Sequence, residues 1–241
     1  MVELAGFAPA ALLARLREGD VAAVVADPLA LGEAVGERLR GARAACDRAG
    51  AALILDERLA APRWAAGGAQ AAFKVTADLA VYGPALANGR PFAALAGRRD
   101  LVAAARHLAP DAFAPTPQGL AAAAATAVVL DHAPVRAVLQ VRGSELAAEL
   151  ERVLGATGAG AWCRVAGDPA AVRLEFDHPH HPPAVLRRRL AAELRARGVL
   201  QRGAISVSYA WGDAEVSAFV DAAAAAFAVV ARGVEGRRAA A

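Results

Sequence analysis

Apolar runs separated by turn signals predict three short strands between residues 51 and 97. The runs and the residues that end them are Leu53–Leu55 before Asp56, Leu79–Tyr82 before Gly83-Pro84, and Phe92–Ala96 before Gly97. Unbroken apolar runs of this length are typical of parallel strands that are covered on both faces. Chemistry in such sheets lies at the carboxyl ends of the strands, so Asp56 and Pro84 are the first candidate site positions.

The residues before these strands predict a strand–helix–strand unit. Its expected elements are a short helix over Pro9–Glu18, a buried strand over Val21–Val25 that ends at Asp27-Pro28, and a helix over Leu31–Ala49. This last helix is predicted by one apolar stripe, formed by Leu31, Val35, Leu39 and Ala42. Gly50 is suited to end it, and the crossover to the next strand should be right-handed.

The rest of the chain predicts helices and a second, smaller domain. Up to the second domain we expect a loop with a short helix over Trp64–Phe73 and helices over Arg98–Leu108, Leu120–Leu130 and Val135–Leu154. A glycine-rich hinge over Gly155–Gly160 then leads to antiparallel strands over Trp162–Ala166 and Val172–Phe176. The chain should end with a helix over Ala184–Arg197, a strand over Ile205–Tyr209 and a last helix over Ala214–Arg232. We therefore predict an α/β domain over residues 1–132 with a mainly parallel sheet, followed by a small α+β domain over residues 133–241.

Composition excludes several classes of function. The net charge is +3 with acidic residues spread throughout, which is not the clustered basic face of a nucleic-acid-binding protein. Two isolated cysteines, Cys46 and Cys163, lack metal or redox spacing and favour a reducing compartment. The first residues lack an export signal, and the apolar runs Leu120–Leu130 and Ala222–Ala231 are shorter than the roughly 20 residues of a membrane span. We expect a soluble cytoplasmic protein that binds neither nucleic acid nor membrane.

An ordered set of motifs runs through the central stretch. In chain order they are Asp56-Glu57, Arg63, Gly67-Gly68-Ala69-Gln70, Val75-Thr76, Asp78-Leu79, Gly83, Ala87-Asn88-Gly89, Pro91 and Gly97-Arg98. With this order and spacing the chain resembles the fold-type I, class III aminotransferases that use pyridoxal phosphate (PLP), especially the glutamate-1-semialdehyde aminomutase and amino-sugar aminotransferase branch. Asp27-Pro28 and Ala210–Glu215 are weaker matches to further motifs of that family.

The resemblance implies a PLP-transferase large domain, a small C-terminal domain and an obligate dimer with its active sites at the interface. It covers only the later part of a family member. We therefore expect a partial large domain, without the first strands and without the helix N-terminus that grips the cofactor phosphate in the family.

One position departs from the family pattern. Pro84 stands where the family carries its Schiff-base lysine, and its distance from Asp56, 84 − 56 = 28 positions, equals the family spacing. Proline has no primary amine and cannot form the imine. Lys74 is the only lysine of the chain, and it lies before the Leu79 strand, roughly 15 Å or more from the far end of that strand. No catalytic residue is therefore predicted.

The resemblance implies two cofactor-binding positions. Asp56 matches the aspartate that pairs with the pyridine nitrogen of PLP. Thr116 lies two residues after Ala114, which matches the threonine that reaches the partner's cofactor phosphate, so Thr116 serves only if the loop shifts. Arg58 replaces a small apolar residue on the face of the ring and would bring like charge to a pyridinium, so we expect a rearranged or occupied pocket. Without the resemblance, Asp56 is a strand-end carboxylate and Thr116 a turn hydroxyl.

Other chemistry-bearing groups favour structural interpretations. His178, His180 and His181 lie between prolines without the convergent ligands of a metal site, and no metal is predicted. The run Arg187–Arg189 is typical of a solvated helix face. Gly158–Gly160 lacks the lysine and the strand-to-helix context of a phosphate loop.

Three functional hypotheses remain. The first is a degenerate, non-catalytic aminotransferase-like subunit that completes or stabilises another aminotransferase chain, in a heteromer or a homodimer. The second is an active half of a PLP enzyme, whose lysine and phosphate grip come from a partner chain. The third is a module that binds pyridoxamine phosphate (PMP) or another small molecule without turnover. In each case PLP is expected only with a partner chain.

Overall fold

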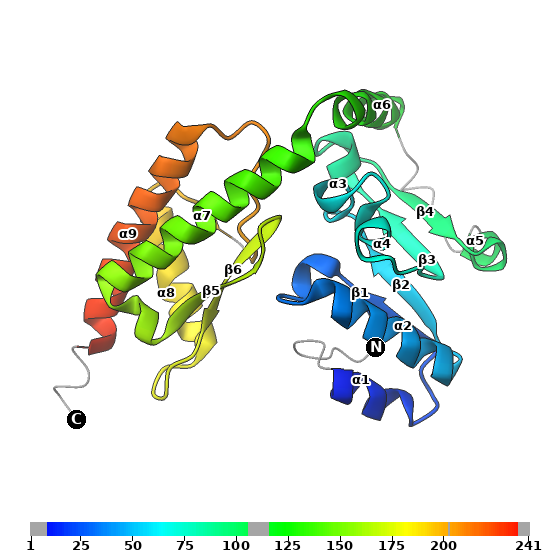
Figure 1. Ribbon diagram of the computed structural model, residues 1–241, viewed down its shortest axis with the longest axis horizontal. Coiled ribbons are helices and arrows are strands. Elements are labelled where there is room, and N and C mark those ends of the chain that lie inside the picture. Colours follow the sequence, from blue (N-terminus) through cyan, green and yellow to red (C-terminus); the bar gives the residue numbers. More distant parts are fainter. Residues whose placement is uncertain (1–8, 106–115, 202, 236–241) are drawn as a thin grey trace. The chain divides into compact units, whose positions relative to one another are not determined.

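The computed structural model describes residues 9–105, 116–201 and 203–235 (Figure 1). The chain folds as two compact units, Met1–Arg136 and Ala137–Ala241. The first unit contains a four-stranded sheet and the second a two-stranded sheet. The mixed α/β fold class predicted from the sequence is confirmed, with helices around a sheet that is mainly parallel.

The sheet of the first unit has the order β1-β2-β3-β4. Its strands are β1 (Ala23–Ala26), β2 (Ala52–Asp56), β3 (Leu79–Tyr82) and β4 (Ala94–Gly97). β2 pairs in parallel with both β1 and β3, whereas β4 runs antiparallel to β3. The helical elements around it are α1 (Pro9–Leu16), η2 (Pro28–Ala30), α2 (Val35–Ala49), α3 (Ala61–Trp64), α4 (Gly68–Phe73), η3 (Pro84–Ala87), α5 (Arg99–Ala105) and α6 (Pro117–His132).

One face of this sheet forms the core of the unit. The buried strand residues on it are Val24, Ala26, Leu53, Leu55 and Ala80. They cluster with Leu12 and Leu16 of α1 and with the apolar stripe of α2. All four predicted stripe residues are buried, although α2 begins only at Val35, after the short helix η2. Gly50 ends α2 in the left-handed conformation that glycine adopts without strain.

The opposite face of the sheet corrects two predictions. Strand Val21–Val25 was expected to be buried, but β1 alternates, and Val25 is 62% exposed. The Phe92 run was expected to form a parallel strand covered on both faces, yet β4 is antiparallel and exposed along its length. The connection through η3 is too short for the crossover that a parallel strand requires, so the chain can only return antiparallel.

The second unit packs three helices with a hairpin. Its elements are α7 (Val135–Thr157), which begins in the first unit, η5 (Ala159–Ala161), β5 (Cys163–Asp168), β6 (Ala171–Phe176), α8 (Pro183–Ala196) and α9 (Asp213–Glu235). β5 and β6 pair antiparallel, as predicted. The largest fully buried side chains of the unit are Phe227, Leu146, Leu150, Leu186, Leu190, Leu194, Val172 and Val207.

Three predicted elements differ in form. Gly155–Gly160 is not a hinge, because α7 continues to Thr157 and η5 follows at once. Ile205–Tyr209 is not a strand, since only Ile205 forms an isolated bridge, to Val172. Ile205 and Val207 instead lie in a loop, and their alternating pattern arises because both side chains are buried. Trp64–Phe73 contains parts of two short helices, α3 and α4, rather than one.

Helix α9 is longer than the apolar run suggested. Over Asp213–Val234 it is long and apolar enough to span a membrane by length and composition alone, and the bent pair α6 and α7 passes the same test when taken together. The buried residues of α9 include Ala223, Ala226, Phe227, Val230 and Val234, which share the side of the helix that faces the core of the unit. Core packing therefore accounts for much of its apolar composition.

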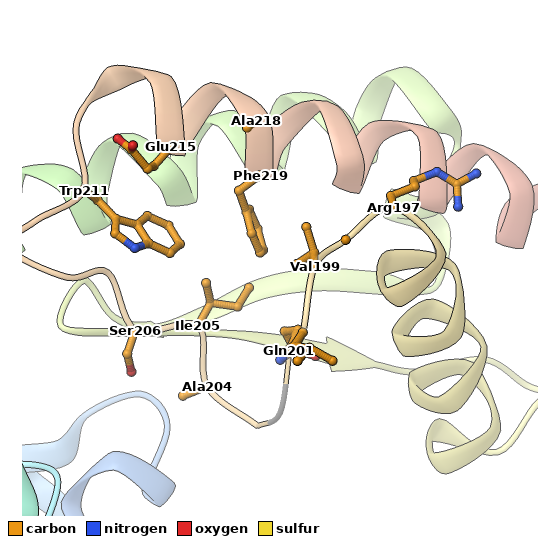
Figure 2. A pocket seen from close by; sticks show the side chains of 12 residues that line it. Arg197, Val199, Gln201, Ala204, Ile205, Ser206, Trp211, Glu215, Ala218 and Phe219 are labelled. Carbon is orange, nitrogen blue, oxygen red and sulfur yellow. The ribbon is translucent and has the colours of Figure 1, made fainter. Parts of the chain in front are cut away.

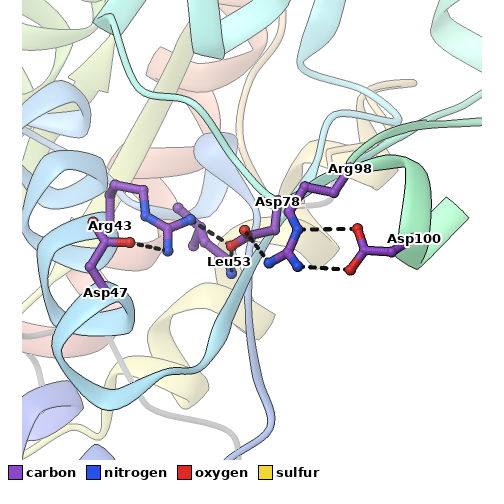
Figure 3. Close-up of polar contacts among 6 residues, drawn as sticks. All are labelled: Arg43, Asp47, Leu53, Asp78, Arg98 and Asp100. Carbon is purple, nitrogen blue, oxygen red and sulfur yellow. Dashed lines mark hydrogen bonds and ion pairs between the residues drawn. The ribbon is translucent and has the colours of Figure 1, made fainter.

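Asp78 connects several elements of the first unit at the start of β3 (Figure 3). Its Oδ2 atom accepts hydrogen bonds from Arg43 Nη1 of α2 at 2.6 Å and from the backbone N–H of Leu53 in β2 at 2.8 Å. Its Oδ1 atom accepts from Arg98 Nη1, beyond β4, at 3.3 Å. Burial acts to raise the pKa of Asp78, but the bonds from Arg43 and Leu53 outweigh it and hold the pKa below its ordinary value.

We expect Asp78→Asn to lower the free energy of unfolding by about 2 kcal/mol, because Arg43 loses its less exposed carboxylate partner and keeps only the exposed Asp47. The control Asp100→Asn, which removes the exposed partner of Arg98, should leave the free energy of unfolding nearly unchanged. Urea unfolding measures both. Equal effects of the two variants would contradict the connecting role of Asp78.

The stability difference between wild type and Asp78→Asn should depend on pH, and the pKa of Asp78 sets the direction of this dependence. The lowered pKa of Asp78 means that its stabilisation is fully present above the unfolded-state pKa, about 3.9, and is lost as the pH falls through the folded-state pKa. The difference between wild type and Asp78→Asn should therefore shrink on acidification. A difference that grows below pH 4 would show that the carboxylate is not the stabilising form.

Candidate functional site

The carboxyl ends of β2 and β3 lie side by side, as the sequence predicted. Asp56, the last residue of β2, is in register with Val81 of β3. The chain continues the pairing for one residue, because the backbone N–H of Glu57 donates to the carbonyl of Val81 at 2.8 Å. Beyond this point Ala85 N–H donates to the carbonyl of Arg58 at 3.3 Å, so η3 begins beside the turn that follows β2.

The carboxylate of Asp56 is bound by Arg58, two residues further on. Its Oδ1 atom accepts from the backbone N–H of Arg58 at 3.1 Å and from Nε at 2.8 Å, and its Oδ2 atom accepts from Nη2 at 2.6 Å. The side-chain hydrogen bonds from Arg58 lower the pKa of Asp56, against a smaller opposing effect of burial. Both carboxylate oxygens therefore already have cationic donors from the same chain.

Gly83 and Pro84 follow directly after β3. A Cβ atom at Gly83 would lie 2.8 Å from Cβ and 2.9 Å from Cγ of Arg58, so only glycine leaves room for the arginine in this position. Pro84 is the first residue of η3, and its carbonyl accepts from the backbone N–H of Gly89 at 2.8 Å. At this position the structure has a turn that proline initiates and no nucleophile.

Glu57 is a buried carboxylate that sequence reasoning treated only as part of a motif. Its side chain is fully buried and accepts from the backbone N–H groups of Ala69 at 3.1 Å and Gln70 at 3.3 Å. Gly68 has a φ of +71°, and a Cβ there would lie 2.6 Å from Glu57 Oε1. Burial raises the pKa of Glu57, and the two N–H bonds act in the opposite direction. Its signal in the sequence is a second acid directly after a strand-end aspartate, followed by paired glycines.

Thr116 caps α6. Its hydroxyl oxygen accepts from the backbone N–H of Gly119 at 3.0 Å, as an N-cap residue does. Ala114, the position matched to the phosphate-binding threonine, lies outside the described residues. The prediction that Thr116 contacts a partner's cofactor phosphate remains a prediction, and the hydroxyl already has a partner within the chain.

Among the residues that the structure describes, the remaining candidate groups do not gather into a second centre. Lys74 ends α4 in a left-handed conformation before β3 begins. The rings of His178 and His181 lie 4.8 Å apart by their centroids, while His178 Nδ1 accepts from the backbone N–H of His180 at 3.0 Å. Within the described ranges no group of three or more His, Cys, Asp or Glu side chains is arranged to hold a metal ion. Cys163 is buried, which raises its pKa to about 12.

The second unit contains a cleft of about 670 Å³ between α9 and the segment that follows α8. Figure 2 shows the rings of Trp211 and Phe219 beside Ile205 and Val199 in this cleft. Its two charged side chains are engaged elsewhere, because Arg197 binds Glu193 at 2.7 Å and Glu215 accepts from the backbone N–H of Gly212 at 2.7 Å. The cleft offers mainly apolar contacts, and Asp56, Pro84 and Thr116 do not line it.

The residues at the strand ends do not fit PLP. The carboxylate that would hold the pyridine nitrogen is taken by Arg58, and the position of the amine is a proline. The hydroxyl expected at the phosphate caps a helix of its own chain. We therefore derive no chemical step through this cofactor. The arrangement has a structural role. The ion pair between Asp56 and Arg58 stabilises the end of β2, and the turn that begins at Pro84 follows β3.

Substitution of Arg58 should return the pKa of Asp56 toward its ordinary value. We expect Arg58→Val to raise the pKa of Asp56 toward about 3.9, since the hydrogen bonds that lower it are removed. Stability should fall by less than about 1 kcal/mol, because Arg58 is largely exposed. An NMR titration of the aspartate carboxyl carbons measures the shift, with Arg99→Ala as the matched control. An unchanged Asp56 titration would contradict the ion pair.

Removal of the Glu57 carboxylate should have a larger effect on stability. Glu57→Ala leaves the N–H groups of Ala69 and Gln70 without an acceptor, and we expect a loss of about 2–4 kcal/mol. Glu57→Gln retains one acceptor oxygen and should lose less. Chemical denaturation tests the series, with the exposed Glu37→Ala as control. Equal stabilities of the Ala and Gln variants would show that the lost acceptor is not the cause.

The amino-acid sequence of this chain is similar to those of known aminotransferases and aminomutases. No family model matches the chain. It is 30% identical over 227 residues to the glutamate-1-semialdehyde 2,1-aminomutase of Nitratidesulfovibrio vulgaris, which covers 86% of this chain and 52% of that protein. It is 36% identical over 108 residues to the 3-aminobutyryl-CoA aminotransferase of Cloacimonas acidaminovorans, which covers 44% of this chain and 26% of that protein. The chain thus spans about half the length, or less, of these curated relatives.

The fold comparison agrees. The FumI protein of a Sphingopyxis species, solved in its PLP internal aldimine form, superposes with a TM-score of 0.74 and 25% identity over 95% of this chain and 57% of that one. The resemblance predicted from the motifs is therefore confirmed: the homologues and structural neighbours of this chain are class III PLP-dependent aminotransferases, and it corresponds to the later part of their chains.

Proposed function

We propose that this chain is a degenerate, non-catalytic class III aminotransferase-like subunit that completes or stabilises the fold of another aminotransferase chain. By analogy with soluble aminotransferases, it would act in the cytoplasm. The observation that carries the proposal is the ion pair between Asp56 and Arg58. Both oxygens of this carboxylate are bound to a guanidinium of the same chain, which a cofactor nitrogen would have to displace.

The end of β3 supports the same conclusion. Pro84 occupies the position that the resemblance assigns to the lysine, and η3 uses it to start a turn. Proline is compatible with the first position of this helical turn, and its ring offers no primary amine for covalent catalysis. Together with the Arg58 pair, it leaves the strand ends with a structural role.

The exposed face of the sheet supports a partner chain. Its apolar residues are Ala23, Val25, Ile54, Leu79, Val81 and Leu95, and each is exposed or only partly buried. Parallel sheets are found almost only with both faces covered. We propose that an aminotransferase-like polypeptide covers this face, in a heteromer or in a homodimer, and that PLP binds only in such an assembly.

Covalent labelling tests whether the chain is catalytic. We expect no PLP adduct after incubation with PLP and reduction with borohydride, as measured by intact mass spectrometry. Lys74→Arg controls for non-specific labelling of the single lysine, and a lysine-bearing class III aminotransferase is the positive control. A stoichiometric adduct on wild type, accompanied by amino-group transfer by this chain alone, would overturn the proposal.

Co-purification tests the assembly. The chain should form a stable complex when co-expressed with aminotransferase-like products of neighbouring genes, and a well-folded monomer under all such conditions would contradict it. A PLP adduct on the partner that depends on Asp56 would instead favour an active shared site. Retention of PMP by this chain without transamination would favour a binding module.

A further inference from the structure

The segment from Phe92 to Ala105 contains β4 and α5, yet none of its residues is buried. β4 is exposed along its whole length, and α5 buries none of its side chains. The strands β1, β2 and β3, in contrast, each contribute buried residues to the core of the unit. This segment, called the strap below, therefore belongs to the sheet without sharing in its core.

The side chains of β4 explain this weak hold. Ala96 pairs with Ala80, a residue of the core, and lies on the same face of the sheet, yet Ala96 is exposed. Leu95 is the one large apolar side chain of the strand, and it is 36% exposed. Because burial of apolar surface is the main favourable contribution to folding, little of it is lost when this strand separates from β3.

A contact between Arg98 and Asp78 holds the end of β4 to the rest of the unit. The backbone N–H of Arg98 donates to the carbonyl oxygen of Asp78 at 2.9 Å, and Arg98 Nη1 donates to Asp78 Oδ1 at 3.3 Å (Figure 3). Gly97 makes the approach possible, because its φ is +143° and a Cβ atom there would lie 2.2 Å from the same carbonyl oxygen. Gly97 and Arg98 together form a latch against Asp78.

Release of this latch leaves the charged groups satisfied. Asp78 Oδ2 keeps its bonds from Arg43 and from the backbone N–H of Leu53. Arg98 Nη2 keeps its bond to Asp100 at 2.7 Å, which lies within the strap. The side chain of Arg98 is 57% exposed, and ion pairs of exposed groups contribute little to stability. The backbone groups that are uncovered on β3 can bind water instead.

The chain just before the strap is anchored to the unit. Ala87 of η3 is buried, and Gly119 of α6 lies so close to Pro91 that a Cβ atom at 119 would be 2.0 Å from the Pro91 carbonyl oxygen. Phe92 and Ala93 connect this anchored part to β4 and lie outside any helix or strand. They are the point about which the strap can turn away from β3.

We propose that the strap is a detachable part of the fold, which opens from β3 about residues 92–93 while β1, β2, β3 and α2 stay folded. Local opening occurs where few apolar contacts are buried and backbone hydrogen bonds are exposed. The latch shifts the equilibrium toward the closed form, and salt weakens the latch by screening an exposed ion pair. In the open form the edge of β3 is free to pair with another strand.

Closure of the strap is coupled to coverage of the exposed sheet face. Leu95 pairs with Val81 on this face. A chain that covers both residues binds the closed form better than the open form and shifts the equilibrium toward closure. This consequence rests on the proposed function, whereas opening is a property of the isolated chain. Measurements on the chain alone therefore test the strap without testing the partner.

Hydrogen exchange of the full chain, followed by mass spectrometry, tests the opening. Amides of residues 94–105 should exchange about 100-fold or more faster than those of β2. Arg98→Gln should accelerate exchange in β4 about three- to tenfold, because the latch loses its ion pair. Arg90→Gln, an equal change at an exposed position outside the strap, should not. High salt should accelerate exchange in wild type but not in Arg98→Gln.

Exchange of β4 as slow as that of β2 would overturn the proposal, because the strap would then open only when the whole unit unfolds. Equal rates in wild type and Arg98→Gln would show that Arg98 does not hold the strap closed. Gly97→Ala is an independent test, since the added Cβ atom blocks the latch. We expect β4 to lose its protection while β2 keeps it. Loss of protection in both strands would contradict a detachable strap.

Discussion

Parallel pairing of β1, β2 and β3 is the constraint on which the first unit depends. A parallel neighbour can be reached only by a crossover, and α2 provides the first of these. All three strands then end at one edge, which brings Asp56 and Pro84 to neighbouring strand ends although 84 − 56 = 28 positions separate them. At the opposite edge Asp78 holds the beginning of β3 to α2 and β2. Ion pairs therefore lie at both edges of the sheet, formed by Asp78 with Arg43 at one edge and by Asp56 with Arg58 at the other.

The candidate site is notable for how fully its polar groups are engaged within the chain. Asp56 is bound by Arg58, Glu57 accepts two backbone N–H groups, and the hydroxyl of Thr116 caps a helix. A binding site normally holds some polar groups ready for a ligand, and each of these already has a partner. The proposed function follows from this distribution: the chain has the fold of the later part of an aminotransferase, while the groups that would meet a cofactor have partners within the chain.

Much of this fold could be predicted from the sequence, because apolar periodicity and turn residues determine where elements begin and end. The stripe of α2, the hairpin of the second unit and the strand-end position of Asp56 are examples. The direction of β4 was predicted wrongly because its apolar run resembles that of β2, although the short connection seen in the sequence already excludes the crossover of a parallel pair. The role of Arg58 was equally hidden. Its charge suggested an altered pocket, but the spacing alone does not reveal that its guanidinium binds both oxygens of Asp56.

The contact between Gly83 and Arg58 makes the two positions dependent on each other. Any side chain at 83 would collide with the Cα, Cβ and Cγ atoms of Arg58, so residue 58 keeps its place beside the end of β3 only while 83 is glycine. If lysine alone were introduced at 84, the charge of Asp56 would still be balanced by Arg58. If Arg58 alone were replaced by a smaller residue, the carboxylate of Asp56 would be free but no amine would be present at 84. Neither single change restores a reactive centre, because the free carboxylate and the amine would each be present without the other.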